Sequence, residues 1–327
     1  MINIPAKDLR YYCSKFEKLR RDFKNGGAPH KPILLISLIQ AFQNGLYSTS
    51  EIYILPELVG LFKSNWKSLV KTNHQCLFTL PFYYMNSEPF WELIPNKGCE
   101  LWIKSKSPMR SFSNLTTAIK CALIDYELKE LLLKKEESNI LLHFLLNTYF
   151  AETEGNFISD SGNSYISEIE NQILKESEET YKVRLLQIRR ELDNDEFQEE
   201  VFVRNSIFKK EIPKIYNYTC CISGLRIDAG DNISMIDACH IIPFSESFND
   251  TISNGIALCP NLHRALDRGL ISINDSYRII INKNFSEPFQ STYNIKQFEG
   301  VNIRLPSNDN HFPSIESLAY HRNKYGF

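Results

Sequence analysis

The 327-residue sequence lacks several features that would place it in a membrane or outside the cell. No apolar run is long enough to cross a bilayer, and the first residues, MINIPAKDLRYY, contain no apolar segment of a secretory leader. The eight cysteines follow no regular spacing and include no CxxC pair, which disfavours a disulfide framework. We therefore expect a cytoplasmic protein with reduced thiols and no membrane partner.

Net charge is also nearly absent, at -2, but the charges are unevenly spread. Residues 1–150 carry 19 Lys and Arg against 13 Asp and Glu, whereas residues 151–200 carry 5 against 14. A basic N-terminal region suits contact with phosphates, and an acidic middle suits a solvated helical spacer. Ordinary surface charge is the alternative explanation.

Helical periodicity dominates the first 150 residues. Apolar residues at three- and four-residue intervals predict helices in DLRYYCSKFEKLRRDF, KPILLISLIQAFQNG and LPELVGLFKSNWKSLV. Residues 76–104 are aromatic and interrupted by prolines, which favours short strands, and residues 114–150 predict two more helices. We predict a mainly helical first domain with a small sheet over residues 1–150.

The composition changes after residue 150. A linker and a long acidic helix are predicted over residues 151–200, followed by short strands, turns and a short helix in a third region, residues 201–327. The fold class is therefore α+β. The long helix carries an approximate apolar stripe, which would suit a homodimer interface or packing within the chain. The stripe consists of Ile166, Ile169, Ile173, Tyr181, Leu185 and Ile188.

A histidine stands near the end of the strand-like run SMIDACHIIPF, residues 234–244. Alternate residues of a strand share a side, so Asp237 and Cys239 are expected on one side and His240 on the other. Taken alone, this histidine could be a core residue, a metal ligand or a catalytic base.

The downstream residues narrow these choices. Asn254 follows 14 residues after His240, and the predicted helix CPNLHRALDRG carries His263 and Asp267 four residues apart. Residues at that spacing share one helix face, where an imidazole and a carboxylate can bind one divalent cation.

Two strands and a helix with His, Asn and His at this spacing resemble the HNH nucleases, a ββα-metal family. The match is most specific in HRALDRGLISI, and it extends through NYTCCISGL and YHRNKYGF, so that it covers about residues 200–327. The resemblance implies a C-terminal ββα-metal domain that hydrolyses phosphodiester bonds.

The resemblance also implies roles for single residues. His240 would be the general base, since neutral imidazole accepts protons near working pH. His263 and Asp267 would hold Mg²⁺ or Mn²⁺, and Asn254 would orient the base by holding the loop between the strands. The catalytic set is therefore His240, Asn254 and His263.

One position departs from the family pattern. Many HNH enzymes have Asp or His immediately before the base as a further metal ligand, and this chain has Cys239 there. Asp237 is the substitute on the same strand side, although strand pleating would direct it past the metal. Arg264 and Arg268, beside the ligands, would contact DNA phosphates or form ordinary salt bridges.

Three further cysteines, Cys220, Cys221 and Cys259, offer a structural zinc site as an alternative to buried thiols. Adjacent cysteines rarely chelate one ion together, so the spacing favours buried thiols.

The N-terminal region contains a second set of motifs. GGAPHKPILLISLI and EPFWELIPNKGCELW resemble the DNA sulfur-binding domain of McrA-like restriction endonucleases over roughly residues 8–150. The resemblance implies that His30, Lys31 and Pro89 approach a phosphorothioate. The family has Tyr-Pro where this chain has Glu88-Pro89, and a carboxylate there would oppose an anionic phosphate.

Several outcomes are open at that position. Glu88 would point away, Tyr83 or Tyr84 would supply the missing ring, or the domain would bind a different modification or unmodified DNA.

Together these motifs predict a metal-dependent endonuclease that binds double-stranded, modified DNA and acts in bacterial restriction. One alternative is an HNH endonuclease for unmodified or base-methylated DNA. Another is a catalytically silent nucleic-acid-binding protein, which the intact His-Asn-His set disfavours.

Overall fold

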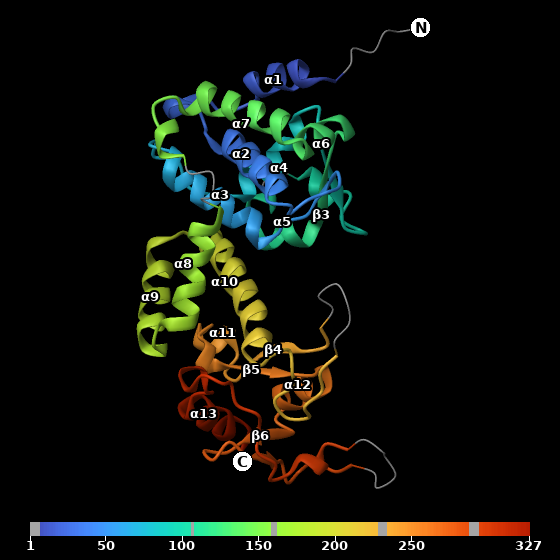
Figure 1. The fold of residues 1–327 in the computed structure, drawn as a ribbon, viewed down its shortest axis with the longest axis vertical. Coiled ribbons are helices and arrows are strands. Elements are labelled where there is room, and N and C mark those ends of the chain that lie inside the picture. The colour runs from blue at the N-terminus through green and yellow to red at the C-terminus, as the bar shows by residue number, and fades with distance from the viewer. Residues whose placement is uncertain (1–6, 106–107, 158–161, 228–233, 288–293) are drawn as a thin grey trace. The chain divides into compact units, whose positions relative to one another are not determined.

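The computed structural model describes residues 7–105, 108–157, 162–227, 234–287 and 294–327, and its contacts divide the chain into two units (Figure 1). The first unit comprises Met1–Glu168 and Glu191–Val203. The second comprises Ile169–Arg190 and Arg204–Phe327. Helices and small sheets are mixed along the chain, as the predicted α+β class requires.

The core of the first unit forms around one apolar helix, α2 (His30–Gln43). Every residue of α2 up to Phe42 is buried, because α3 (Pro56–Leu69), α6 (Tyr126–Leu133) and α7 (Lys135–Phe150) all pack on it. Figure 1 shows α7 running beside α2, and α1 (Leu9–Glu17) packs on α7. The helices predicted for the first 70 residues are therefore present.

A three-stranded antiparallel sheet completes this unit, in the order β1-β3-β2. Its strands are β1 (Glu51–Ile52), β2 (Trp91–Pro95) and β3 (Ile119–Ile124). The central strand β3 has the sequence IKCALI, which we had assigned to a helix. A short apolar run fits both periodicities, and pairing on both edges decides in favour of the strand.

The predicted strand segment 76–104 also contains a helix, α4 (Thr79–Tyr84). Pro81 is tolerated because it lies in the first turn, where backbone N–H groups have no partner within the helix. Another short helix, α5 (Phe112–Ala118), leads into β3. The 3₁₀ turns of this unit are Lys24–Gly26, Met85–Ser87, Trp102–Lys104, Pro108–Arg110 and Glu154–Asn156.

The acidic segment forms three helices and not the single long helix predicted. They are α8 (Gly162–Lys175), α9 (Glu178–Glu191) and α10 (Asn194–Ile215). The helices are separated at polar residues whose side chains cap the start of the next helix. Ser177 Oγ accepts from Thr180 N at 3.3 Å, and Asp193 Oδ1 accepts from Glu196 N at 2.9 Å, so each polar residue starts a new helix. Residues 158–161 of the predicted linker lie outside the described residues.

The apolar stripe of this segment is covered within the chain. Ile169, Ile173, Tyr181 and Leu185 are each at most 2% exposed. These four side chains pack within the chain, while Ile166 and Ile188 of the stripe are half-buried.

The second unit contains a β-hairpin followed by a helix. β4 (Asp237–His240) pairs antiparallel with β5 (Gly255–Leu258), with His240 opposite Gly255, and α12 (Pro260–Asp267) packs on both strands (Figure 1). Pro260 at the start of α12 and Gly269 after its end, with φ of 62°, fix the helix bounds.

The remaining elements surround this ββα unit. A second antiparallel pair, β6 (Ile271–Ile273) and β7 (Ile279–Ile281), follows α12, and the C-terminal helix α13 (Ile315–Tyr325) packs on β6. The helix α11 (Phe244–Ser247) and the 3₁₀ turn Ile252–Asn254 lie between β4 and β5 in sequence. Two further 3₁₀ turns are Lys296–Phe298 and Asp309–His311.

Across the described ranges, no helix has both the length and the apolar character needed to span a bilayer.

Candidate active site

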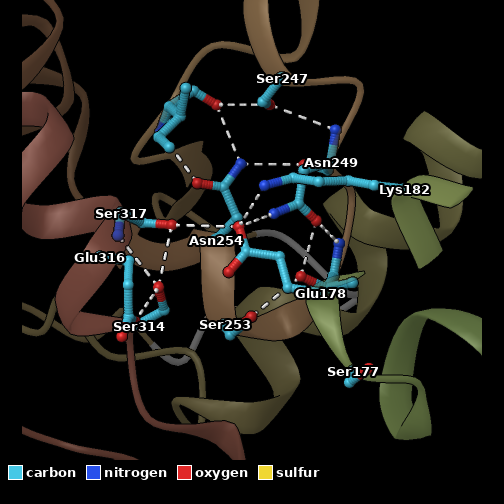
Figure 2. A network of polar contacts seen from close by, with 12 residues as sticks. Ser177, Glu178, Lys182, Ser247, Asn249, Ser253, Asn254, Ser314, Glu316 and Ser317 are labelled. Atoms are coloured by element: carbon cyan, nitrogen blue, oxygen red, sulfur yellow. Dashed lines mark hydrogen bonds and ion pairs between the residues drawn. The ribbon is translucent and has the colours of Figure 1, made fainter. Parts of the chain in front are cut away.

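Asn254, the residue just before β5, holds the loop that follows β4. Its side chain is fully buried, with Oδ1 accepting from Ile242 N at 2.9 Å. Its Nδ2 donates to Ile242 O and to Asn249 O, both at 2.9 Å (Figure 2). All the bonds of this amide go to the backbone on either side of α11. Asn254 therefore fixes the loop shape and leaves no atom for chemistry.

A wider polar network anchors the same loop. Asn249 accepts from Thr251 N and Oγ1 at 3.0 and 2.7 Å and donates to Glu178 at the start of α9. Glu178 also pairs with Lys182 at 3.2 Å and accepts from Ser317 of α13 at 3.4 Å (Figure 2). Three elements distant in sequence thus meet at one carboxylate, which limits movement of the loop.

His240, the last residue of β4, is held on two sides. Its Nε2 lies 2.7 Å from Asp250 Oδ1, and Asp250 is fully buried. The imidazole stacks on Phe208 of α10, with ring centroids 3.8 Å apart and planes at 6°. Phe244 approaches at 6.2 Å. The His240 side chain keeps 16% of its surface exposed, so the ring remains accessible while its orientation is fixed.

His263, on α12, lies between two carboxylates. Its Nδ1 is 3.2 Å from Asp237 Oδ2, and its Nε2 is 3.5 Å from Asp267 Oδ2. Asp237 thus contacts His263 on the ring nitrogen opposite the one that faces Asp267. The three side chains are 27%, 47% and 54% exposed in the order His263, Asp237, Asp267, which leaves the group open to an ion from solvent.

Cys239 approaches the same group from β4. Its Sγ is 3.9 Å from Asp267 Oδ1, and ligand atoms of Cys239, His263 and Asp267 all lie within 4.8 Å of one another. Burial raises the pKa of the Cys239 thiol well above its usual value, because desolvation disfavours the thiolate. A coordinated cation reverses that preference and deprotonates a thiol. The sulfur, nitrogen and oxygen donors present fit a divalent cation.

The residues of this hairpin and helix match a known family model. Residues 220–274 match the family described as HNH endonuclease, and the matched segment contains His240, Asn254 and His263. This segment of the chain is therefore similar to HNH endonucleases.

Other comparisons add little. The chain is similar to a solved structure described as "Modification dependent TagI restriction endonuclease", with 22% sequence identity and a TM-score of 0.29. That match covers 36% of this chain and 36% of the other chain, so it spans about a third of the other chain's length. No curated protein matches the sequence.

The other residues expected near the nuclease site occupy different settings. Arg264 and Arg268 on and just after α12 are exposed, and neither forms a salt bridge within the described part of the chain. Cys220, Cys221 and Cys259 are buried free thiols. They join no group of three metal-ligating side chains among the residues that the structure describes.

The first unit contains a cavity of about 450 Å³ at the first N-terminal motif. Basic and imidazole side chains, one carboxylate and an apolar wall line it. The basic and imidazole side chains are Arg20, Arg21, His30, Lys31, His74 and Arg110, the carboxylate is Asp22, and the wall is Leu80, Pro81 and Tyr84.

His30 is buried at the edge of this cavity. Its Nε2 donates to Gln75 O at 2.9 Å, and its ring lies 4.7 Å from the Trp66 ring. Desolvation lowers the pKa of His30 to about 4, so the imidazole is neutral at pH 7. A neutral ring can donate a hydrogen bond but adds no charge to the cavity.

Lys31 is 6% exposed and forms an ion pair with Glu88, while its Nζ also donates to Ser87 Oγ at 2.8 Å. Glu88 Oε1 in turn accepts from Arg20 N at 3.0 Å. The carboxylate that departs from the family pattern thus points inward, and its charge is balanced. Pro89 is exposed and does not line the cavity, whereas Pro81 and Tyr84 do.

Sequence reasoning missed two residues of the candidate active site, Asp250 and Phe208. Asp250 lies four positions before Asn254, and Phe208 lies 32 before His240 on another helix. Neither belongs to the spaced motif, and only the fold brings them to the imidazole.

Proposed function

We propose that the protein is a metal-dependent endonuclease that cleaves double-stranded DNA. The observation that carries this proposal is the position of His263 between Asp237 and Asp267, on the helix that follows the hairpin of His240 and Asn254. An imidazole flanked by carboxylates and a thiol is a ligand set for a divalent cation, and an oriented second imidazole nearby in the fold is a general base.

The chemistry follows from the positions of these side chains. His240 accepts the proton of the attacking water, held in place by Phe208 and by the loop that Asn254 anchors. Bound Mg²⁺ or Mn²⁺ would supply charge neutralisation at the scissile phosphate and the leaving oxygen. His263, Asp267 and Cys239, with Asp237 beside them, would hold that ion. Arg264 and Arg268 are free to contact phosphates along the DNA backbone.

Plasmid cleavage tests this function. Purified protein with Mg²⁺ or Mn²⁺ should nick or linearise supercoiled DNA, and EDTA should abolish the activity. His240→Ala should lower the rate about 10²–10⁴-fold, the usual contribution of a general base. His143→Ala is a matched control, because its side chain is 66% exposed and lies in the first unit. Cleavage that survives His240→Ala would refute the assigned base, and no cleavage by wild type would favour a silent binding protein.

We infer that the cavity of the first unit recognises a modified DNA backbone, with phosphorothioate as the modification. Sulfur in place of a phosphate oxygen is more polarizable and less strongly hydrated, so an apolar wall favours it. Leu80, Pro81 and Tyr84 would provide the wall, and Arg20, Arg21 and Arg110 the charge for the anion. This role agrees with bacterial restriction of modified DNA in the cytoplasm.

A second substrate class is favoured by one observation. Because Glu88 neutralises Lys31, the cavity keeps fewer cations for one modified phosphate than the motif predicts. Recognition of unmodified or base-methylated DNA through general phosphate contacts would tolerate this loss.

Binding to matched duplexes separates the two classes. The full-length protein should bind a phosphorothioate duplex at least about tenfold more tightly than its unmodified counterpart, a difference of about 1.4 kcal/mol. Pro81→Ser should reduce that preference while leaving the salt dependence unchanged, since it removes apolar wall and no charge. Equal affinity for both duplexes, at two salt concentrations, would exclude the sulfur-specific function but not the nuclease activity.

The assembly on DNA is a further proposal. A single HNH site cuts one strand, so double-strand cleavage would require a second copy of the chain. The ratio of linear to nicked plasmid as protein concentration rises would measure this.

A further inference from the structure

We propose that Asp250 is a positioning residue that fixes the tautomer of His240 and makes Nδ1 the basic nitrogen. This inference rests on the proposed role of His240 as general base. It adds which atom of the ring accepts the proton and which residue determines that choice.

The hydrogen bond between the two side chains has a defined direction. Asp250 Oδ1 lies 2.7 Å from His240 Nε2, and an ionised carboxylate can only accept hydrogen bonds. Nε2 must therefore carry the hydrogen. In neutral imidazole the other nitrogen, Nδ1, then has the free lone pair.

Asp250 makes its side-chain hydrogen bond with His240. Its side chain is fully buried, and its second oxygen, Oδ2, has no hydrogen-bond partner among the described residues. The imidazole is thus the one hydrogen-bond donor that this buried carboxylate has there. A buried carboxylate with a single donor favours keeping that hydrogen bond, because a buried acceptor without a partner is unfavourable.

The position of Asp250 is set independently of His240. Its chain neighbours are both tied into the loop, because Asn249 Oδ1 accepts from Thr251 N and the Asn249 carbonyl accepts from Asn254. On the other side, Phe208 stacks on the imidazole face and prevents the ring from tilting. The two side chains meet because each is held by its own surroundings.

The proton transfer then has a specified route. Nδ1 takes a proton from water, the water oxygen forms a bond to phosphorus, and the bond from phosphorus to the leaving oxygen breaks. The ring becomes an imidazolium, whose charge lies next to the Asp250 carboxylate. Asp250 keeps its own protonation state throughout, so it acts through His240 and contacts no substrate atom.

Asp250→Asn tests the direction of the bond. An amide of the same shape can donate from its nitrogen to Nε2, which would place the hydrogen on Nδ1 and block the basic atom. We expect a fall in cleavage rate of about 10²–10⁴-fold, comparable with loss of a general base. Affinity for Mn²⁺ should not change, because Asp250 makes no contact with His263 or Asp267.

The tautomer itself can be read by NMR. In full-length protein with ¹⁵N-labelled histidine, at a pH where the ring is neutral, long-range ¹H–¹⁵N correlations should show the Nε2–H form. The signal of His240 is assigned by its loss in His240→Ala. In Asp250→Asn this signal should shift towards the Nδ1–H form.

Thr251→Val is the matched control. It removes a hydroxyl from the same loop, where Thr251 Oγ1 donates to Asn249 Oδ1 at 2.7 Å, without touching the imidazole. It should lower thermal stability and leave the tautomer of His240 as in wild type.

The outcomes separate this inference from the proposed function. A wild-type spectrum with the Nδ1–H form would overturn the role of Asp250 even if His240→Ala abolishes cleavage. The Nε2–H form together with full activity of His240→Ala would instead overturn the base assignment. Because the wild-type spectrum is decisive, the test does not depend on whether Asp250→Asn folds.

Discussion

Phe208 of α10 and His240 of β4 lie face to face, with their ring planes 6° from parallel. An aromatic ring thus forms one wall of the position occupied by the proposed general base. The stack makes the orientation of the base depend on a helix that precedes the HNH segment.

Replacing Phe208 by leucine should therefore affect catalysis more than stability. We expect the free energy of unfolding to fall by about 1–2 kcal/mol and kcat to fall about 10- to 100-fold, because the imidazole is no longer held in one plane. Urea unfolding measures the first effect, and plasmid cleavage measures the second. Phe312→Leu is the matched control, since its ring packs on Tyr277. Equal loss of kcat in both variants would contradict a specific role for the stack.

Gly255, opposite His240 in the hairpin, should not tolerate a side chain. A Cβ there would lie 2.2 Å from Ile212 Cδ1 and 2.8 Å from Phe208 Cζ, so both side chains would have to move. Gly255→Ala should destabilise the protein by about 1–3 kcal/mol and reduce cleavage. Gly155→Ala, with no atom within 4 Å of its Cβ, should be neutral in thermal melts and plasmid assays. Wild-type melting of Gly255→Ala would show that the hairpin can adjust.

The buried pair of Lys31 and Glu88 should be more costly to break than to remove. Their side chains are 7% and 5% exposed, so Glu88→Ala leaves a buried ammonium and should cost about 3–5 kcal/mol. Replacing both residues by Met should recover much of that loss. All three tryptophans lie in the first unit, so tryptophan fluorescence in urea reports its unfolding selectively. A double variant no more stable than Glu88→Ala would contradict this.

His30 should make the first unit less stable in acid. Burial lowers its pKa from 6.5 to about 4, so the unfolded chain takes up a proton that the folded chain refuses. Its stability contribution is complete above pH 6.5 and is lost as the pH falls towards 4. Between pH 7 and pH 5 we expect a loss of about 2 kcal/mol.

Urea unfolding followed by tryptophan fluorescence at several pH values measures this loss. His30→Asn cannot titrate, so it should flatten the pH dependence, while His143→Ala should keep it. An unchanged pH dependence in His30→Asn would assign the effect to other groups.

The proposed metal ligands should contribute unequally to the affinity for the cation. His263 can give only one nitrogen to a given ion, and Cys239 and Asp267 form a group with it while Asp237 meets the opposite nitrogen. Metal-bound histidines usually donate their second N–H to a carboxylate, which suits Asp237. Asp237→Asn should therefore weaken Mn²⁺ binding about 10- to 100-fold. Asp267→Asn should weaken it more, because Asp267 would contact the ion directly.

Calorimetric titration with Mn²⁺ orders these variants. Co²⁺ absorption provides a separate readout, because a sulfur-to-cobalt charge-transfer band should disappear in Cys239→Ala. If Asp237→Asn weakened Mn²⁺ binding more than Asp267→Asn, Asp237 would be the ligand and Asp267 the residue that orients His263.

The sequence alone was informative where function depends on local spacing. The four-residue interval of His263 and Asp267 on a helix, and the hairpin before it, follow from periodicity and turn signals. Asp250 and Phe208 could not be found in this way, because their contacts with His240 depend on a loop path and on a distant helix. Likewise, the partner of Glu88 is Lys31, 57 residues away, and no local pattern encodes that pairing.

The short strand β3 also could not be predicted from local sequence. IKCALI has no decisive period of its own, and its strand state depends on neighbours at both edges. The helix breaks at Ser177 and Asp193 were in principle visible, since both are favoured helix-starting residues.

The chain enters the second unit at Ile169, returns to the first at Glu191 and leaves it again at Arg204. No single cut can therefore release either unit with all of its own residues. A fragment that begins at residue 201 would contain the HNH motif but lose Gln172 and Tyr181, the hydrogen-bond partners of buried Arg204. Proteolysis or truncation that removes the residues before 201 should therefore yield a damaged fold.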